Sequence, residues 1–180
     1  MAPRKSLIDA VQSLLSALTT PSTPKSTLLS TFTTNPPPLC FEHGLPQLAP
    51  FLGRSFTGQE GISHYFDLLS QHLNIQNMNF ELDTAWVVDE VSMTVCLRGN
   101  AKFVWKSTDQ AWDETFIYRI VVAEDAGKGL KVQEYRVWAD TGAAYLARLG
   151  RLGLLVTVGE MENPEGVHVT EDVDGAKMCG

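Results

Sequence analysis

The chain has 180 residues, of which 44% are hydrophobic and 19% are charged, as expected for one globular domain with a substantial core. Its formal net charge of −7 argues against nucleic acid and anionic membrane as partners, because both are bound through cationic surfaces. The three cysteines lack the spacing of a metal site or of a disulfide framework, so we expect reduced thiols and a cytoplasmic protein.

The two ends of the chain differ from its middle. Residues 160–180 hold six acidic residues and one lysine, which leaves the rest of the chain at −2. We therefore predict a domain over residues 1–150 and an acidic extension over 151–180, disordered from about residue 160. The first twenty residues have the outline of a signal peptide, but Asp9 and Gln12 interrupt its apolar run. A mitochondrial transit peptide is the alternative interpretation of this segment. No apolar run is long enough to span a bilayer.

Three helices are predicted in the first half of the chain. Apolar residues from Leu7 to Leu18 recur at helical spacing and form one stripe. A short second helix follows Pro24 and carries Leu28, Leu29 and Phe32. A third helix should run from about Gly58 to Leu73, where Thr57 and Glu60 have the spacing of a capping box.

The second half has the alternation of strands. A short strand over Leu39–His43 comes earlier, and from Met78 onward the apolar period is two. We predict strands over about 78–88, 91–106, 111–124 and 130–139, joined by short polar turns as antiparallel hairpins. This order of elements predicts an α+β fold, a curved antiparallel sheet covered by the three helices.

The last long strand ends at Asp140, which precedes Thr141-Gly142 and a predicted closing helix over Ala143–Leu149. A carboxylate at this position either caps that helix or takes part in chemistry, and the cap is the stronger interpretation. The apolar segment Arg151–Val158 is predicted to form a strand or to dock on the domain.

Three segments resemble the SnoaL-like family of the nuclear-transport-factor-2-like superfamily, and fungal members of it in particular. They are FTGQEGISHYFDLL (56–69), WDETFIYRIVV (112–122) and GLKVQEYRVWADTGAAYLA (129–147). The resemblance covers about residues 5–148. It implies a cone-shaped, cystatin-like α+β barrel that encloses an apolar pocket and works without a metal or an organic cofactor. It does not fix the activity, because this superfamily includes both enzymes and binding modules.

Glu114 and Tyr118 are the first candidates for catalysis. They alternate with Trp112, Phe116 and Ile120 on the bulkier face of their strand, which we expect to face the pocket. At ~3.3 Å per residue they lie about 13 Å apart and would reach a ligand from its two ends. A glutamate in an apolar cavity gains a raised pKa, and a tyrosine there can donate to a developing oxyanion.

Glu134 and His43 are the further candidates, and each has a structural alternative. Glu134 is either a second carboxylate of the pocket or the partner of Arg119 across the sheet. His43 titrates near neutral pH and lies near the expected pocket wall, with Glu42 pointing the other way. A single histidine is also common as a purely structural residue.

Five aromatic residues are predicted to bind the ligand. They are Phe116 and the four tryptophans, one on each long strand: Trp86, Trp105, Trp112 and Trp138. Such rings suit a flat apolar ligand, and they suit a well-packed sheet equally well.

Three functions follow from these observations. The first is an isomerase, cyclase or dehydratase, without a cofactor, that acts on a small polyketide-like or terpenoid-like molecule. The second is a module that binds a small apolar ligand without chemistry. The third is a dimerisation module, a homodimer through the outer sheet face, where Ile117 and Val121 are apolar but Arg119 lies between them.

Overall fold

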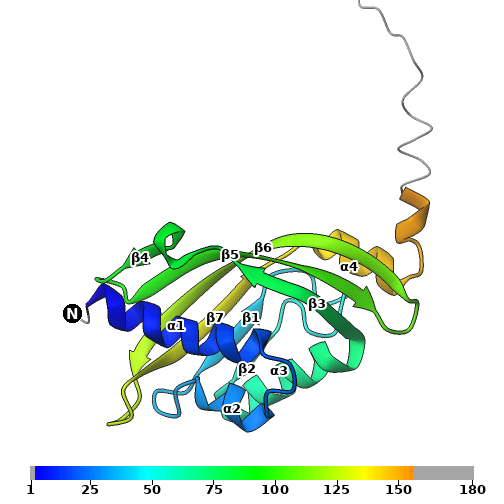
Figure 1. The fold of residues 1–180 in the computed structure, drawn as a ribbon. Helices are drawn as coiled ribbons and strands as arrows, with labels where there is room; N and C mark the ends of the chain where they lie inside the picture. Colours follow the sequence, from blue (N-terminus) through cyan, green and yellow to red (C-terminus); the bar gives the residue numbers. More distant parts are fainter. Residues whose placement is uncertain (1–2, 156–180) are drawn as a thin grey trace, which may run out of the picture.

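A curved, mixed sheet forms the centre of the structure, a computed structural model that describes residues 3–155 (Figure 1). The sheet order is β2-β1-β7-β6-β5-β3. Strand β4 pairs with the first residues of β5. The strands are β1 (Leu39–Glu42), β2 (Ser55–Thr57), β3 (Leu73–Phe80), β4 (Val87–Asp89), β5 (Thr94–Trp105), β6 (Gln110–Glu124) and β7 (Leu130–Trp138). The predicted α+β class with helices on a curved sheet is confirmed, and the sheet does not close into a barrel.

Strands β5, β6 and β7 form the predicted antiparallel meander, within a few residues of the expected bounds. The expectation of a purely antiparallel sheet is wrong at one pair, because β1 runs parallel to β7. This pair joins a strand that precedes the third helix to the last strand of the chain. Sequence patterns carry no information about such a long-range pairing, which is decided by tertiary packing.

The strand predicted over 78–88 is also misplaced. Strand β3 continues directly from the preceding helix at Leu73 and ends at Phe80, and a 3₁₀ turn, η1 (Asp83–Ala85), follows it. Within the apparent alternation Leu82 is 78% exposed whereas Trp86 is 6% exposed, so the pattern spans a bend rather than a sheet face. A register shift between Gln76 and Asn79 adds a bulge to β3.

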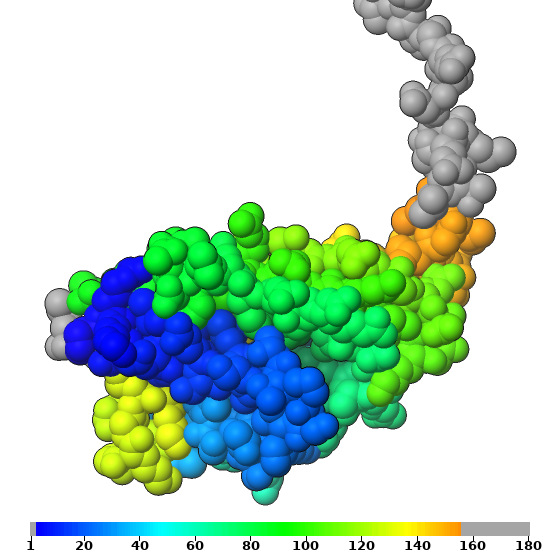
Figure 2. Space-filling view, viewed as in Figure 1, coloured from blue at the N-terminus to red at the C-terminus, as the bar shows by residue number. Residues whose placement is uncertain are grey.

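Helices α1 (Arg4–Thr19), α2 (Lys25–Ser30) and α3 (Gly58–His72) lie against the concave side of the sheet (Figure 1). Helix α1 buries the predicted stripe against the sheet, with Leu7, Val11 and Leu14 fully buried. Figure 2 shows α1 and α2 (blue) covering this side of the molecule. All three predicted helices are present. The predicted capping box is not, because the side chain of Thr57 makes no capping hydrogen bond.

The closing helix α4 (Thr141–Arg148) follows β7, and Asp140 caps it as predicted. Its carboxylate accepts hydrogen bonds from the backbone N–H groups of Gly142 and Ala143 at 2.9 and 3.1 Å.

Residues 152–155 form one helical turn rather than a strand. The remainder of the segment to Val158, and the acidic extension with its expected disorder, lie outside the described residues. Helix α1, in the amino-terminal segment, packs its apolar stripe on the sheet, and the transit-peptide alternative stays a prediction.

Candidate active site

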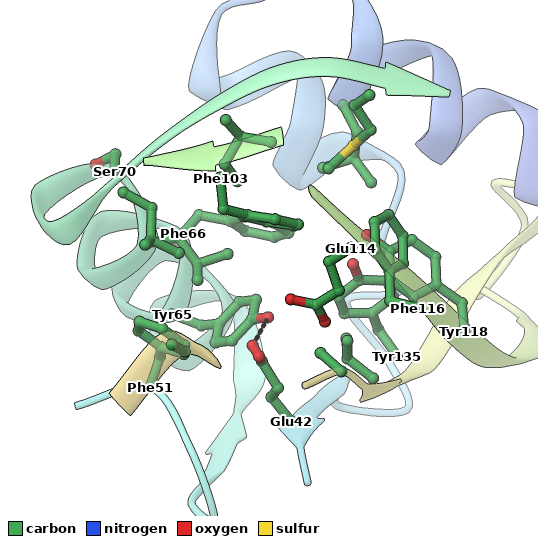
Figure 3. Close-up of a pocket in the computed structure, with 18 of the residues that line it drawn as sticks. Glu42, Phe51, Tyr65, Phe66, Ser70, Phe103, Glu114, Phe116, Tyr118 and Tyr135 are labelled. Atoms are coloured by element: carbon green, nitrogen blue, oxygen red, sulfur yellow. Dashed lines mark hydrogen bonds between the residues drawn. The ribbon is translucent and has the colours of Figure 1, made fainter. Parts of the chain in front are cut away.

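A cavity of about 660 Å³ lies between the concave side of the sheet and the helices. Its wall is mostly apolar, with the rings of Phe51, Phe66, Phe103 and Phe116 among its linings (Figure 3). The end of α1, the loop after it and residues of α2 also line the cavity, from Leu18 to Leu28. A concave, mostly apolar space with a few polar groups is the usual form of a small-molecule site.

Glu114 and Tyr118 both line this cavity from β6, so their predicted inward orientation is correct. Glu114 is held at both carboxylate oxygens. The indole Nε1 of Trp112 donates to Oε2 at 2.6 Å, and the backbone N–H of Asp140 donates to Oε1 at 2.5 Å. Partial burial raises the pKa of Glu114, and these two donors oppose that rise. The carboxylate is therefore fixed in orientation at the cavity wall.

A second carboxyl group, Glu42 of β1, lies in the same cavity and was not predicted. It is 7% exposed, and the hydroxyl of Tyr65 on α3 donates a hydrogen bond to its Oε2 at 2.7 Å (Figure 3). Desolvation raises the pKa of Glu42 to about 7, the Tyr65 hydrogen bond lowers it, and the nearby Glu114 raises it. Among the described residues no hydrogen bond reaches the other oxygen, Oε1. Glu42 thus combines a pKa near neutrality with a free oxygen, which suits a general acid or base.

The orientation of β1 explains why Glu42 was missed. The sequence presents Leu39, Phe41 and His43 as the bulkier alternate set, which favours placing that set inward. In the structure Glu42 pairs with Val137 and Phe41 pairs with Arg136 of the parallel strand β7. Because Val137 faces the cavity, Glu42 faces it too, and the prediction that Glu42 points away is wrong. The available signal was Cys40, which shares a strand face with Glu42 and belongs to a residue type that is often fully buried.

Two phenols from neighbouring strands, Tyr118 and Tyr135, also line the cavity. Tyr135 of β7 lies next to Tyr118, with ring centroids 4.8 Å apart and the planes at 67°. Both side chains are buried, and burial raises the pKa of each well above its ordinary value. They are therefore neutral hydroxyls at physiological pH and can donate hydrogen bonds. Tyr135 faces inward because a register shift between Val121 and Val122 changes the alternation of β7.

The structure places Glu134 and His43 on the other face of the sheet, away from the cavity lining. Glu134 accepts hydrogen bonds from Arg119 and Arg136, both at 3.1 Å, and these partners lower its pKa. The structural alternative for Glu134 is therefore the one observed. The His43 ring stacks on Trp138, with centroids 4.0 Å apart and an interplanar angle of 11°. Burial and the charge of Arg136 lower the pKa of His43.

The five predicted ligand-binding aromatics divide into two groups. Trp112 and Phe116 line the cavity. The other three tryptophans do not. Trp86 is buried in the core and donates its indole N–H to Glu81 O, and Trp105 packs between the rings of Phe51 and His72. Trp138 is 40% exposed on the outer face. Of the four tryptophans only Trp112 lines the cavity, and the packing alternative is the one observed for the buried Trp86 and Trp105.

The described residues also bear on metal ions, membranes and a second subunit as partners. In residues 3–155 no three histidine, cysteine or carboxylate side chains are grouped so as to hold a metal ion. None of the helices in the described part of the chain has the length and apolar character that a membrane crossing demands. The outer sheet face carries the 45% exposed Ile117, and the homodimer through this face stays a prediction.

Comparison with known proteins gives the fold a name. No model of a protein family matches the chain, and no curated protein matches it. Solved structures do match. An NTF2-like protein from Burkholderia xenovorans has a TM-score of 0.62 at 19% identity, over 79% of this chain and 95% of its own. The BvnE pinacolase from Penicillium brevicompactum has a TM-score of 0.57 at 15% identity, over 86% and 98%.

A third structure, described as a SnoaL-like polyketide cyclase from a Jannaschia species, matches with a TM-score of 0.59 at 14% identity, over 82% of this chain and 94% of its own. The chain therefore has the NTF2-like cone fold that the resemblance implied. Identities below 20% carry no residue-level information. The chemistry has to be argued from the cavity itself.

Proposed function

We propose that the protein is an acid–base enzyme of the isomerase, cyclase or dehydratase type, acting on a small, largely apolar metabolite of polyketide-like or terpenoid-like character. The observation that carries the proposal is Glu42, a carboxyl group with a pKa of about 7 inside an apolar cavity of about 660 Å³. A buried group that titrates near the working pH exchanges protons with little free-energy cost in either direction.

Glu42 is the proton-transfer group in this proposal. Its Oε2 is held by Tyr65, so Oε1 is the oxygen that meets the substrate. In a first step Oε1 takes a proton from a carbon next to a substrate carbonyl group, and the electron pair of the C–H bond moves to the carbonyl oxygen. In a second step Glu42 returns the proton to another carbon of the same molecule. No electrons are gained or lost, so the reaction needs no redox partner.

The negative oxygen that develops between these steps needs a hydrogen-bond donor. Tyr118 and Tyr135 line the cavity as neutral phenols, and a preorganised donor of this kind contributes about 3 kcal/mol of transition-state stabilisation. In a cyclisation or a dehydration Glu114 is the second carboxyl group, which protonates or deprotonates the oxygen that reacts. Two carboxyl groups in different environments commonly divide the two roles in this way.

Two of the structural neighbours, described as a SnoaL-like polyketide cyclase and a pinacolase, support this class of reaction. The alternative function is ligand binding without chemistry in the same cavity. The two functions differ only in whether the bound ligand is converted. The tested quantity is therefore proton transfer rather than binding.

A simple ketone tests the proposal. We expect the protein to catalyse exchange of the C2 protons of 1-tetralone in D₂O, followed by NMR, and the Glu42→Gln variant to lose about 10²–10⁴-fold of that rate. Glu134→Gln is the matched control, because it changes a carboxylate on the opposite sheet face and should keep the full rate. Exchange by Glu42→Gln at the wild-type rate would contradict the role of Glu42. Binding of 1-tetralone without exchange would favour the non-catalytic alternative.

A further inference from the structure

The charge of the cavity wall is one-sided. Four carboxyl groups lie along it, Glu42, Asp67, Glu114 and Asp140, against a single basic side chain, Lys25. The ammonium group of Lys25 contacts both carboxylate oxygens of Asp67 at 2.6 Å, so this pair is neutral. Asp140 is occupied as the cap of α4. Glu42 and Glu114 are left without a cationic partner in the described residues.

The arginines nearest in the sheet do not supply that partner. Arg119 and Arg136 lie on the outer face, where both bind Glu134. Their side chains point away from the cavity because they alternate with the inward residues Tyr118 and Tyr135. Glu42 is buried and Glu114 is half-buried, and ionising either carboxyl group without a counter-charge beside an apolar wall costs free energy. That cost falls when a cation enters the cavity.

Aromatic rings surround the Glu114 end of the cavity. The ring of Phe103 lies parallel to that of Trp112, with centroids 5.5 Å apart and an angle of 22°, and meets the edge of Phe116 at 6.1 Å. The faces of such rings carry partial negative charge and attract ammonium groups, a contact worth about 2 kcal/mol in a desolvated site. Carboxylate and rings therefore favour the same type of ligand.

Figure 3 shows the carboxylate of Glu114 directed into the same space as the Glu42–Tyr65 pair. We propose that the natural ligand of this cavity is a lipophilic organic cation, an amine or ammonium group on an apolar body, with the positive charge bound between Glu114 and the rings of Phe103 and Trp112. Glu42 then faces the uncharged part of the ligand. Carboxylates, phosphates and other anions are disfavoured, because the cavity offers them no unpaired cationic side chain among the described residues. This inference rests on the proposed function only in treating the ligand as a substrate.

An isosteric pair of probes isolates the charge. Benzyltrimethylammonium and neopentylbenzene have the same shape and differ in one central atom, nitrogen or carbon, and phenylacetate serves as the anion. We expect calorimetric titration of the wild-type protein to give an affinity about tenfold or more higher for the cation than for the hydrocarbon, and no binding of phenylacetate. Since this comparison uses the unaltered protein, it does not depend on how any variant folds.

Two variants locate the charge. Glu114→Gln should lose about tenfold in affinity for benzyltrimethylammonium and keep its affinity for neopentylbenzene within about twofold. Glu134→Gln, on the opposite sheet face, should bind both probes as the wild type does. Equal wild-type affinities for the two probes, binding of phenylacetate, or an unchanged preference in Glu114→Gln would overturn the inference.

The two proposals fail independently. Suppose that benzyltrimethylammonium binds no better than neopentylbenzene while Glu42→Gln still abolishes the exchange of 1-tetralone. The proposed enzymatic function is then retained, and its substrate is uncharged. If the cation is preferred while 1-tetralone exchange is absent or does not depend on Glu42, the cavity is a cation-binding site without the proposed proton transfer.

Discussion

The hydroxyl of Tyr65 and the Oε2 atom of Glu42 are 2.7 Å apart, and this hydrogen bond joins the helix α3 to the short strand β1 inside the cavity. It opposes the desolvation that raises the pKa of Glu42, because it stabilises the ionised carboxylate. The pair therefore sets the pH range in which the proposed proton transfer operates, and it also determines which carboxylate oxygen is free.

The first prediction concerns this hydrogen bond. Tyr65→Phe removes the donor and keeps the ring, so the pKa of Glu42 should rise further. A hydrogen bond to a charged group is worth about 1.5–3 kcal/mol, which corresponds to roughly one to two pH units. In a pH–rate profile of 1-tetralone exchange, the rising limb should move from near pH 7 to higher pH by that amount. A limb that does not move would mean that another group, not Glu42, limits the rate.

The second prediction concerns stability. The folded-state pKa of Glu42, about 7, is above the ordinary value of 4.5, so the folded protein binds this proton more tightly than the unfolded chain. The stabilisation is complete below pH 4.5 and is lost as pH rises through 7. Over that window the free energy of unfolding of the wild type should fall by roughly 3 kcal/mol relative to Glu42→Gln, which has no titrating group there.

Urea unfolding of both proteins at pH 5 and pH 8.5 measures this difference. Contributions from His43 and His72, whose pKa values are lowered by burial, are common to both proteins and cancel in the comparison. A difference between wild type and Glu42→Gln that is the same at both pH values would show that Glu42 has an ordinary pKa in the folded state.

The sequence predicted the inner face of β6 correctly but not that of β1, and the reason is physical. In β6 a run of fifteen residues alternates between bulky and polar side chains, so the side of Glu114 and Tyr118 is determined locally. Strand β1 has four residues, and its orientation depends on pairing with β7, more than ninety positions later in the chain. The pattern of four residues cannot report that pairing.

The tryptophans illustrate a second limit. Trp105, Trp112 and Trp138 lie on strands as predicted, whereas Trp86 lies between η1 and β4. Even for a correctly placed strand, burial alone does not separate a cavity wall from a solid core. Trp105 is 2% exposed and packs against Phe51 and His72, whereas Trp112 is half-buried because the cavity lies beside it. Only the arrangement of several elements in space creates the cavity, so the sequence of one strand does not reveal which ring lines it.

A third prediction concerns Asp140, which caps α4. Asp140→Ala removes the acceptor for the N–H groups of Gly142 and Ala143 and should lower the free energy of unfolding by about 1 kcal/mol. Asp140→Asn is the matched control, since asparagine is an equally good capping residue and should retain stability. The backbone N–H of Asp140 that binds Glu114 remains in both variants. Asp140→Ala should therefore lower stability more than turnover. Denaturant titration measures the first quantity, and the rate of 1-tetralone exchange measures the second.

The last prediction separates the two roles of Trp112, which supplies both an aromatic face and an N–H donor. Trp112→Phe keeps a ring next to Phe103 but removes the hydrogen bond to Glu114 Oε2. Because that bond stabilises the carboxylate, its loss should raise the pKa of Glu114, so the group would be protonated over a wider range of acidic pH. Binding of benzyltrimethylammonium should then weaken at lower pH more steeply in Trp112→Phe than in the wild type, while neopentylbenzene binding should stay independent of pH. Identical pH dependence of cation binding in the two proteins would show that the indole N–H does not control the charge of Glu114, and that Trp112 acts through its ring alone.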